Sequence, residues 1–193
     1  RTICAGVDNL IAKQGLEQDA VMLWVDWFSI HQGDRPLKLK GVESLIKYTT
    51  LCQYMLVPTE ETELEGAAAL FPNRIPGYGA RGWCRAELMC ASLAPGGAKD
   101  VLLVRSKDAS PIFLDASATN VSLSPCMGDY SNEADRGRIA RVLDRLIDAK
   151  LDEELEAGRV AEYRRLQCMR SWYTRASSEG GRGAPPRSAG DDE

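Results

Sequence analysis

The sequence predicts an α/β protein in which helices cover both faces of a parallel sheet, so that the domain is a three-layer sandwich. Two observations predict this class. Short apolar runs typical of buried strands alternate with segments whose apolar residues recur at helical spacing. From the first residues the order is helix, strand, helix, strand, helix, strand, which suits a parallel sheet with helical crossovers. We expect parallel strands at about residues 20–26, 53–57 and 101–104.

A first helix is expected over residues 2–14, and Gly15 follows it as a stop. Its apolar residues recur at helical spacing and are Ile3, Val7, Leu10 and Ile11. The apolar run over residues 20–27 then indicates a buried strand, and the polar residues 29–36 indicate a loop.

A second helix is expected over residues 38–51, and a short buried strand over 53–58 follows it. The segment from 58 to 80 is rich in glycine, proline and acid, which predicts a long loop. The third helix begins near Gly82 and ends at about Leu93, before the Pro-Gly-Gly sequence that follows.

The second half holds fewer expected elements. A strand is expected at 101–104, and the weakly periodic segment that follows has room for one more around 112–114. A long amphipathic helix over 134–157 carries a continuous apolar stripe, and a further helix follows it. We therefore divide the chain into an α/β domain over residues 1–130, C-terminal amphipathic helices over 131–175, and a tail over 176–193. That tail is too polar to bury a core.

Composition narrows the classes of function. A chain of 193 residues with 44% hydrophobic and 27% charged residues is typical of one medium globular domain. A net charge of −4 gives no electrostatic footprint for nucleic acid. No apolar run approaches the roughly 18 residues that span a bilayer, so no membrane partner is expected. Neither a dinucleotide-binding glycine motif nor a P-loop occurs.

The six cysteines form no CxxC pair, and His31 is the only histidine. Structural zinc sites need closely spaced thiolates or imidazoles, so no metal is expected. A chain with this much core material has little need of disulfides, which indicates reduced thiols in a cytosolic or nuclear compartment. Of the two, we expect a cytoplasmic location.

Two short stretches, residues 23–32 and 81–88, each place an acid beside tryptophan. In the first, Asp26 comes where the expected strand ends, at the edge where α/β sheets bind ligands. In the second, Trp83 and Glu87 are four residues apart and share one face of a helix. A carboxylate beside a large aromatic suits a small-ligand site. The same residues also fit a turn acid at Asp26 and a core tryptophan at Trp83.

The first stretch, Leu-Trp-Val-Asp-x-x-Ser-Ile-x-Gln, resembles the start of a fungal heterokaryon-incompatibility (HET) domain. The second, Arg81-x-Trp83-x-x-x-Glu87, is similar to a later motif of that family and to the Trp-Cys-x-x-Glu-Leu of TIR domains. The resemblance covers roughly residues 2–105. It implies a TIR-like, flavodoxin-like sheet whose first strand has no counterpart here.

The resemblance also implies an activity. Enzymatic TIR domains cleave NAD between nicotinamide and ribose with a glutamate at the position that Glu87 matches. Trp83, Asp26 and Ser29 would then line the substrate pocket, with NAD as substrate and no resident cofactor. The alternative that it implies is a non-catalytic signalling or scaffold module that self-associates through TIR-like surfaces.

Three other features of the sequence are weaker candidates for a functional site. His31 lacks an acid spaced to orient it as a general base. Cys84 is near a helix start, where thiol pKa values fall, yet its position turns it toward Leu88 and the sheet. Glutamates over residues 60–65 lack the ligand order of a calcium loop and would repel a dinucleotide phosphate.

The resemblance places the missing first strand between the strands at 20–26 and 53–57. The chain begins at Arg1 rather than methionine, so we expect this strand to lie upstream in a longer protein. Without it, unpaired backbone groups would each cost roughly 1 to 3 kcal/mol, and residues 1–193 alone would aggregate or fold in part.

Overall fold

The computed structural model describes residues 2–59, 76–105, 111–114 and 124–175. Its class is mixed α/β, as the sequence predicts. The elements in chain order are α1 (Thr2–Gln14), η1 (Gln18–Ala20), α2 (Asp26–Ser29), α3 (Arg35–Glu43), α4 (Leu45–Leu51), β1 (Tyr54–Pro58), α5 (Pro76–Ala80), α6 (Gly82–Leu93), β2 (Asp100–Val104), β3 (Ile112–Leu114), η5 (Pro125–Met127), α8 (Ala134–Glu156) and α9 (Val160–Thr174).

The sheet has the strand order β1-β2-β3. Strands β1 and β2 are parallel, with Tyr54 opposite Asp100, which confirms the predicted strands at 53–57 and 101–104 and their direction. Strand β3 confirms the short strand at 112–114, but it runs antiparallel to β2. The sheet is therefore mixed, and the expectation of parallel strands alone is wrong.

The predicted strand at 20–26 is also wrong. A 3-10 turn occupies Gln18–Ala20, the following residues are extended without a strand partner in the described ranges, and Asp26 opens the short helix α2. The hydroxyl of Ser29 accepts the N–H of Val25 at 3.1 Å, so local bonding takes a backbone group that a strand would offer to a neighbour. An apolar run predicts burial but cannot supply the second strand.

The second helix differs from its prediction in two ways. It begins earlier, at Arg35, because the Asp34 carboxylate accepts the N–H of Leu37 at 2.9 Å and Pro36 fits the first turn. It is also divided at Ser44 into α3 and α4. Helix α5 is a further difference, since the sequence predicts a loop there.

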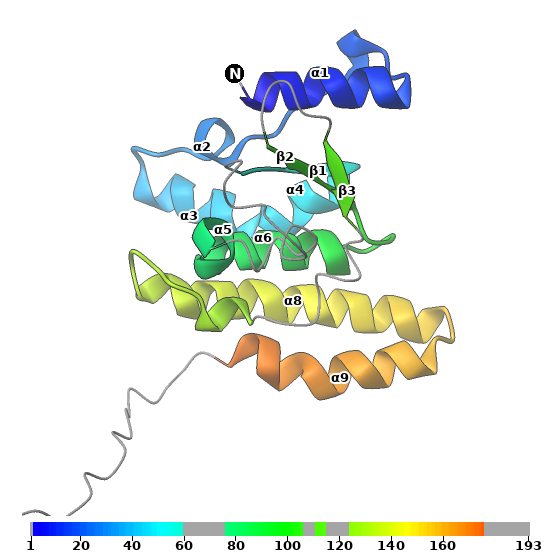
Figure 1. Cartoon of the computed structure of the whole chain (residues 1–193). Coiled ribbons are helices and arrows are strands. Elements are labelled where there is room, and N and C mark those ends of the chain that lie inside the picture. The colour runs from blue at the N-terminus through cyan, green and yellow to red at the C-terminus, as the bar shows by residue number, and fades with distance from the viewer. Residues whose placement is uncertain (1, 60–75, 106–110, 115–123, 176–193) are drawn as a thin grey trace, which may run out of the picture.

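Helices lie on both sides of the sheet (Figure 1). Alternate residues of β2 point to opposite faces, as in any strand. Val101 and Leu103 pack with Leu88 of α6 on one face. On the other, Gly6 of α1 approaches Val104 so closely that a Cβ on the glycine would lie 2.7 Å from a valine methyl. Helix α1 thus contacts one face of β2, and α6 packs on the other.

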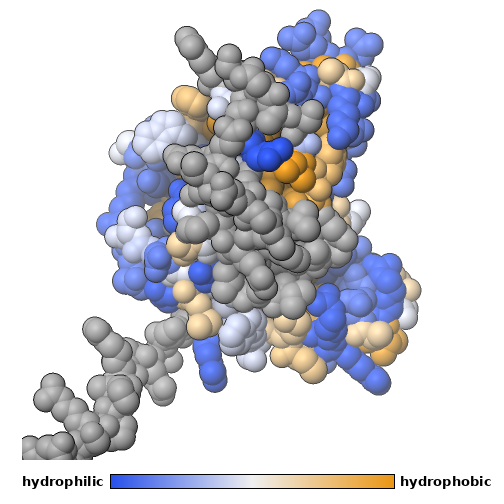
Figure 2. Space-filling view, in the orientation of Figure 1, coloured by the Kyte–Doolittle hydropathy of each residue, from blue (hydrophilic) through white to orange (hydrophobic). Residues whose placement is uncertain are grey.

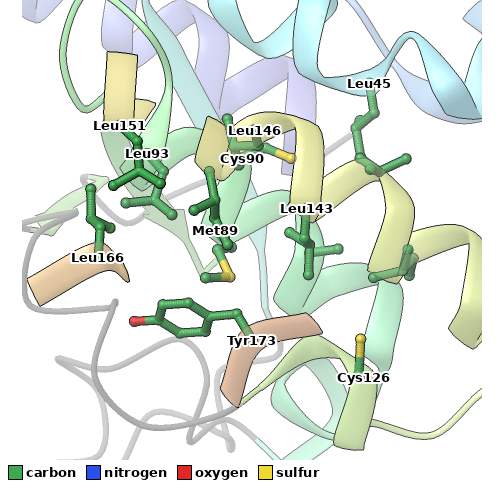
Figure 3. Packing of buried hydrophobic residues seen from close by; sticks show 14 residues of the cluster. Leu45, Met89, Cys90, Leu93, Cys126, Leu143, Leu146, Leu151, Leu166 and Tyr173 are labelled. Atoms are coloured by element: carbon green, nitrogen blue, oxygen red, sulfur yellow. The ribbon is translucent and has the colours of Figure 1, made fainter. Parts of the chain in front are cut away.

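The larger core lies on the far side of α6 from the sheet, between α4, α6, α8 and α9 (Figure 3). Its fully buried members include Cys90, Ile139, Leu143, Leu146 and Ile147. The apolar stripe predicted for residues 134–157 is the face of α8 that packs here, which confirms that helix. Helix α9 packs beside α8 and contributes Leu166 and Tyr173.

Helices α8 and α9 form a hairpin that turns at Gly158, whose φ is 68°. The tail over 176–193 and the glutamates over 60–65 lie outside the described residues. On the face drawn in Figure 2, α1 is mainly hydrophilic, and hydrophobic atoms gather beside the strands below it. No helix in the described ranges is both long enough and apolar enough to cross a bilayer.

Candidate functional site

Glu87 lies in the middle of α6, and the start of that helix is fixed by backbone contacts. The N–H of Gly82 donates to the carbonyl of Asp129 at 3.0 Å, and the N–H of Asp129 donates to that of Ala80 at 2.8 Å. A Cβ on Gly82 would lie 2.0 Å from Cζ of Tyr130, so only glycine allows this approach. These contacts position the helix that carries Glu87.

Arg85, on the same helix, forms hydrogen bonds to one segment before α6 and to one after it. Its Nε donates to the carbonyl of Gly79 at 2.5 Å, and its Nη1 donates to that of Ser124 at 3.2 Å. Desolvation lowers the pKa of this guanidinium. Arg85 therefore donates to backbone carbonyls, and the neighbours of the Glu87 carboxylate are other residues.

Tyr78 and Arg81 surround Glu87. The hydroxyl of the buried Tyr78 lies 3.5 Å from Oε2 of Glu87, which is long for a hydrogen bond. The guanidinium of Arg81 lies over the Tyr78 ring, 5.9 Å from its centroid. No cation in the described ranges comes within ion-pair distance of Glu87.

The pKa of Glu87 is raised from 4.5 to about 7. Desolvation is the largest cause, and the negative charge of Asp26 adds to it. The charge of Arg81 and the Tyr78 hydroxyl lower the pKa but do not offset these two effects. The side chain is only partly exposed, so the direction agrees with its surroundings. The charge of Asp26, from the first sequence stretch, therefore acts on Glu87 of the second.

Asp26 belongs to a turn that hydrogen bonds hold from several sides. Its Oδ1 accepts the N–H of Trp27 at 2.6 Å. The side-chain amide of Gln32 donates to the carbonyls of Ile30 at 2.9 Å and Trp27 at 3.4 Å. Ser29, predicted to bind substrate, is exposed here, and its hydroxyl caps Val25.

His31 has a local role in the next turn. Its Nδ1 accepts the N–H of Asp34 at 2.8 Å, so the Nε2 carries the proton in the neutral ring. This bond supports the residue that caps α3 and gives His31 a structural function.

Trp83 has its contacts on α8 and in the larger core. Its indole N–H donates to Oδ2 of Asp135 on α8 at 3.3 Å, and its ring packs against the larger core. Trp24, from the first stretch, also packs against that core and stacks on Tyr48 with a centroid distance of 5.1 Å. Both tryptophans contribute to packing, and the predicted part of Trp83 in a pocket stays a prediction.

The thiols near Glu87 are poor nucleophiles. Burial raises the pKa of Cys84 and of Cys90 to about 12, and the charge of Glu87 adds to both shifts. A thiol at such a pKa carries almost no thiolate at neutral pH. Cys84 packs with Leu88 against the sheet, as its position in the sequence predicts. All six cysteines are free.

The described part of the chain was searched for side chains that could bind a metal ion together. No group of three or more His, Cys, Asp or Glu side chains there is placed to hold an ion.

Sequence reasoning found both acids and named Arg81 as part of the second motif, but it missed Tyr78. Tyr78 stands in a Gly- and Pro-rich segment that predicts a loop, and only helix α5 turns its ring toward α6. A tyrosine followed three residues later by an arginine is the signal that could have pointed to the cation–π pair.

Comparison of this chain with protein-family models, with curated proteins and with solved structures found no match.

Proposed function

We propose that this protein is a TIR-like domain that hydrolyses NAD at the bond between nicotinamide and ribose, with Glu87 as the essential carboxylate. One observation carries the proposal. The negative charge of Asp26 raises the pKa of Glu87, although the two motif acids belong to different elements. Two features of the fold support a flavodoxin-like strand order for this domain. Strands β1 and β2 are parallel neighbours, and α1 and α6 contact opposite faces of β2.

The proposed chemistry needs few groups. The bond between C1′ of the ribose and the pyridinium nitrogen breaks, and its electron pair stays on nicotinamide, which leaves neutral. Positive charge then develops on the ribose, and an ionised Glu87 stabilises it. A water oxygen bonds to C1′ and gives its proton to the carboxylate or to solvent. The products are nicotinamide, ADP-ribose and one proton.

Glu87 suits this role because it is partly desolvated and free of an ion pair in the described ranges. Electrostatic support is stronger where water is excluded. The Tyr78 hydroxyl, 3.5 Å away, is placed to orient the carboxylate.

The decisive measurement is nicotinamide release from NAD, followed by chromatography at high protein concentration. Glu87→Gln keeps the side-chain shape but removes the charge, so we expect a rate lower by about 10² to 10³. Glu43→Gln, an exposed glutamate of α3, is the matched control and should keep the parent rate. A Glu87→Gln protein with the parent rate would refute the assignment.

A self-associating scaffold is the second candidate. It is favoured by four large apolar side chains exposed within one short stretch: Met22, Leu23, Trp27 and Phe28. Sedimentation analysis tests it. A protein that releases no nicotinamide and forms concentration-dependent oligomers would support this candidate instead.

A further inference from the structure

Two buried polar atoms lie at the carboxyl ends of the two parallel strands. Thr59 directly follows β1, and Arg105 directly follows β2. Oγ1 of Thr59 and Nε of Arg105 are both shielded from solvent, and neither has a hydrogen-bond partner among the residues that the structure describes. Thr59 as a whole is only 9% exposed. Buried donors without an acceptor are rare in folded proteins, so two of them at one edge of a sheet need a physical explanation.

The backbone holds these two residues side by side. Pro58 and Val104 form the last pair in the register of β1 and β2. The next N–H, that of Thr59, donates to the carbonyl of Val104 at 3.0 Å, so the ladder continues one residue beyond the strands. Thr59 is therefore the neighbour of Arg105 across the ladder. Because side chains alternate in step along paired strands, the two side chains lie on the same face.

That face is the one that α5 and α6 cover. Val57, two residues before Thr59, packs in the cluster that contains Tyr78. Leu103, two residues before Arg105, packs in the same cluster. Helix α6 connects β1 to the parallel β2, so it runs in the opposite direction and its N-terminal end lies at this edge. The positive end of the helix dipole therefore adds to the charge of the arginine.

The chemistry of the two side chains selects an anion. An arginine is cationic and carries donors only, and a threonine hydroxyl can donate as well. No carboxylate in the described ranges lies within ion-pair distance of Arg105. A ligand with oxygens on several sides can accept from both residues at once. Guanidinium and hydroxyl groups are common donors to phosphate oxygens, which have this arrangement.

We propose that Thr59 and Arg105 form a binding site for a phosphate-type oxyanion at the carboxyl ends of β1 and β2. Ligands of α/β sheets bind outside this edge, where the loops diverge. The site does not rest on the proposed hydrolysis, since Arg105 is not among the charges that act on Glu87.

The test is a titration of the full chain with sodium phosphate, and separately with sodium acetate and with sodium chloride at matched ionic strength. The protein is labelled with ¹⁵N at its arginines, and Arg105→Lys identifies the Nε–H signal of Arg105 by removing it. We expect this signal to move with phosphate and to saturate, and to stay in place with the other two salts. A signal that does not move, or that moves equally with acetate or chloride, would overturn the proposal.

Variants supply a second measurement, the rise in melting temperature that phosphate produces by binding the folded state. Thr59→Val keeps the shape of the side chain but removes the hydroxyl, so the phosphate affinity should fall roughly three- to tenfold. Arg105→Gln removes the charge, and the affinity should fall by more than about tenfold. Arg141→Gln changes an exposed arginine of α8 and is the matched control, which should bind as the parent does.

The two variants fail in different ways, so the proposal stays testable if one of them does not fold. Thr59→Val removes a hydroxyl that has no partner in the described ranges, so it should fold as the parent does. Equal phosphate affinity in Thr59→Val and the parent would overturn the paired site. An equal loss of affinity in Arg105→Gln and Arg141→Gln would show a general attraction of phosphate to positive charge and would overturn it too.

Discussion

The negative charge of Asp26 raises the pKa of Glu87, although one residue opens α2 and the other lies within α6. Desolvation of Glu87 is the larger cause, so the glutamate accepts a proton near neutral pH while the exposed aspartate lies on the solvent side.

Asp26→Asn should lower the pKa of Glu87, because it removes a neighbouring negative charge and leaves burial unchanged. The measurement is a titration of the Glu87 carboxyl carbon by NMR in parent and variant. Asp8→Asn, an exposed acid on α1, is the control and should leave that titration as it is. An unchanged Glu87 titration in Asp26→Asn would mean that the two acids do not interact.

Glu87→Gln should stabilise the fold at pH 8 but hardly at pH 5. The folded pKa of about 7 exceeds the ordinary 4.5, so between these values the folded state binds more protons than the unfolded state. Stability therefore falls as pH rises from 4.5 to 7, and the full penalty of a desolvated charge is present above 7. Its removal should add roughly 1 to 3 kcal/mol at pH 8.

Urea unfolding of parent and Glu87→Gln at both pH values measures this difference. Other titrating groups contribute to both proteins and cancel in the comparison. A variant that is less stable than the parent at pH 8 would contradict the raised pKa and would mark Glu87 as a structural residue.

The sequence predicts most helices and three strands because their residues alone determine those elements. The stripe of α8 and the glycine at 158 suffice to place a long helix and its end. Residues 21–25 show the limit of this reasoning, since an apolar run becomes a strand only beside a partner, and Ser29 bonds locally instead. The direction of β3 likewise depends on its pairing with β2, which no periodicity encodes.

The candidate site was predictable in part for a similar reason. Asp26 and Glu87 stand out because each accompanies tryptophan in a dense stretch. Their interaction, the proximity of Tyr78, and the turn of Trp83 toward Asp135 all depend on how α2, α5 and α8 pack around α6. Such contacts come from tertiary structure, so sequence spacing indicates the residues but not their neighbours.

Gly82→Ala should destabilise the protein by roughly 1 to 3 kcal/mol, because the new Cβ would overlap Tyr130 and force backbone or ring to move. The ring cannot withdraw freely, since its hydroxyl donates to the Pro125 carbonyl at 2.7 Å. Gly137→Ala is the matched control. Its Cβ would meet nothing nearer than 3.9 Å within α8, so it should stabilise by about 1 kcal/mol.

Thermal or urea unfolding of the two alanine variants checks the sign of each effect. A Gly82→Ala protein as stable as the parent would show that the start of α6 can shift without cost. In that case Glu87 would also lose its fixed position, and its NMR titration would move with the substitution.

Glu154→Gln should lower the melting temperature of the α8–α9 hairpin, because this buried carboxylate bonds two cations at the turn. Lys150 lies 3.2 Å from it within α8, and Arg159 donates to it at 2.5 Å from beyond Gly158. The bond from Arg159 holds the pKa of Glu154 below its ordinary value, so this stabilisation is present above pH 4.5 and is lost as pH falls below it.

The control for the hairpin is Glu162→Gln on α9, which removes a pair with Arg165 in which both side chains are largely exposed. Exposed pairs contribute little because solvent screens them, so this variant should melt close to the parent. The two variants lose the same charge but differ in the burial of the glutamate and in the number of cations that it bonds. Equal melting temperatures would therefore mean that the turn at Gly158 is held by the apolar contacts of Leu151 and Leu166 rather than by Glu154.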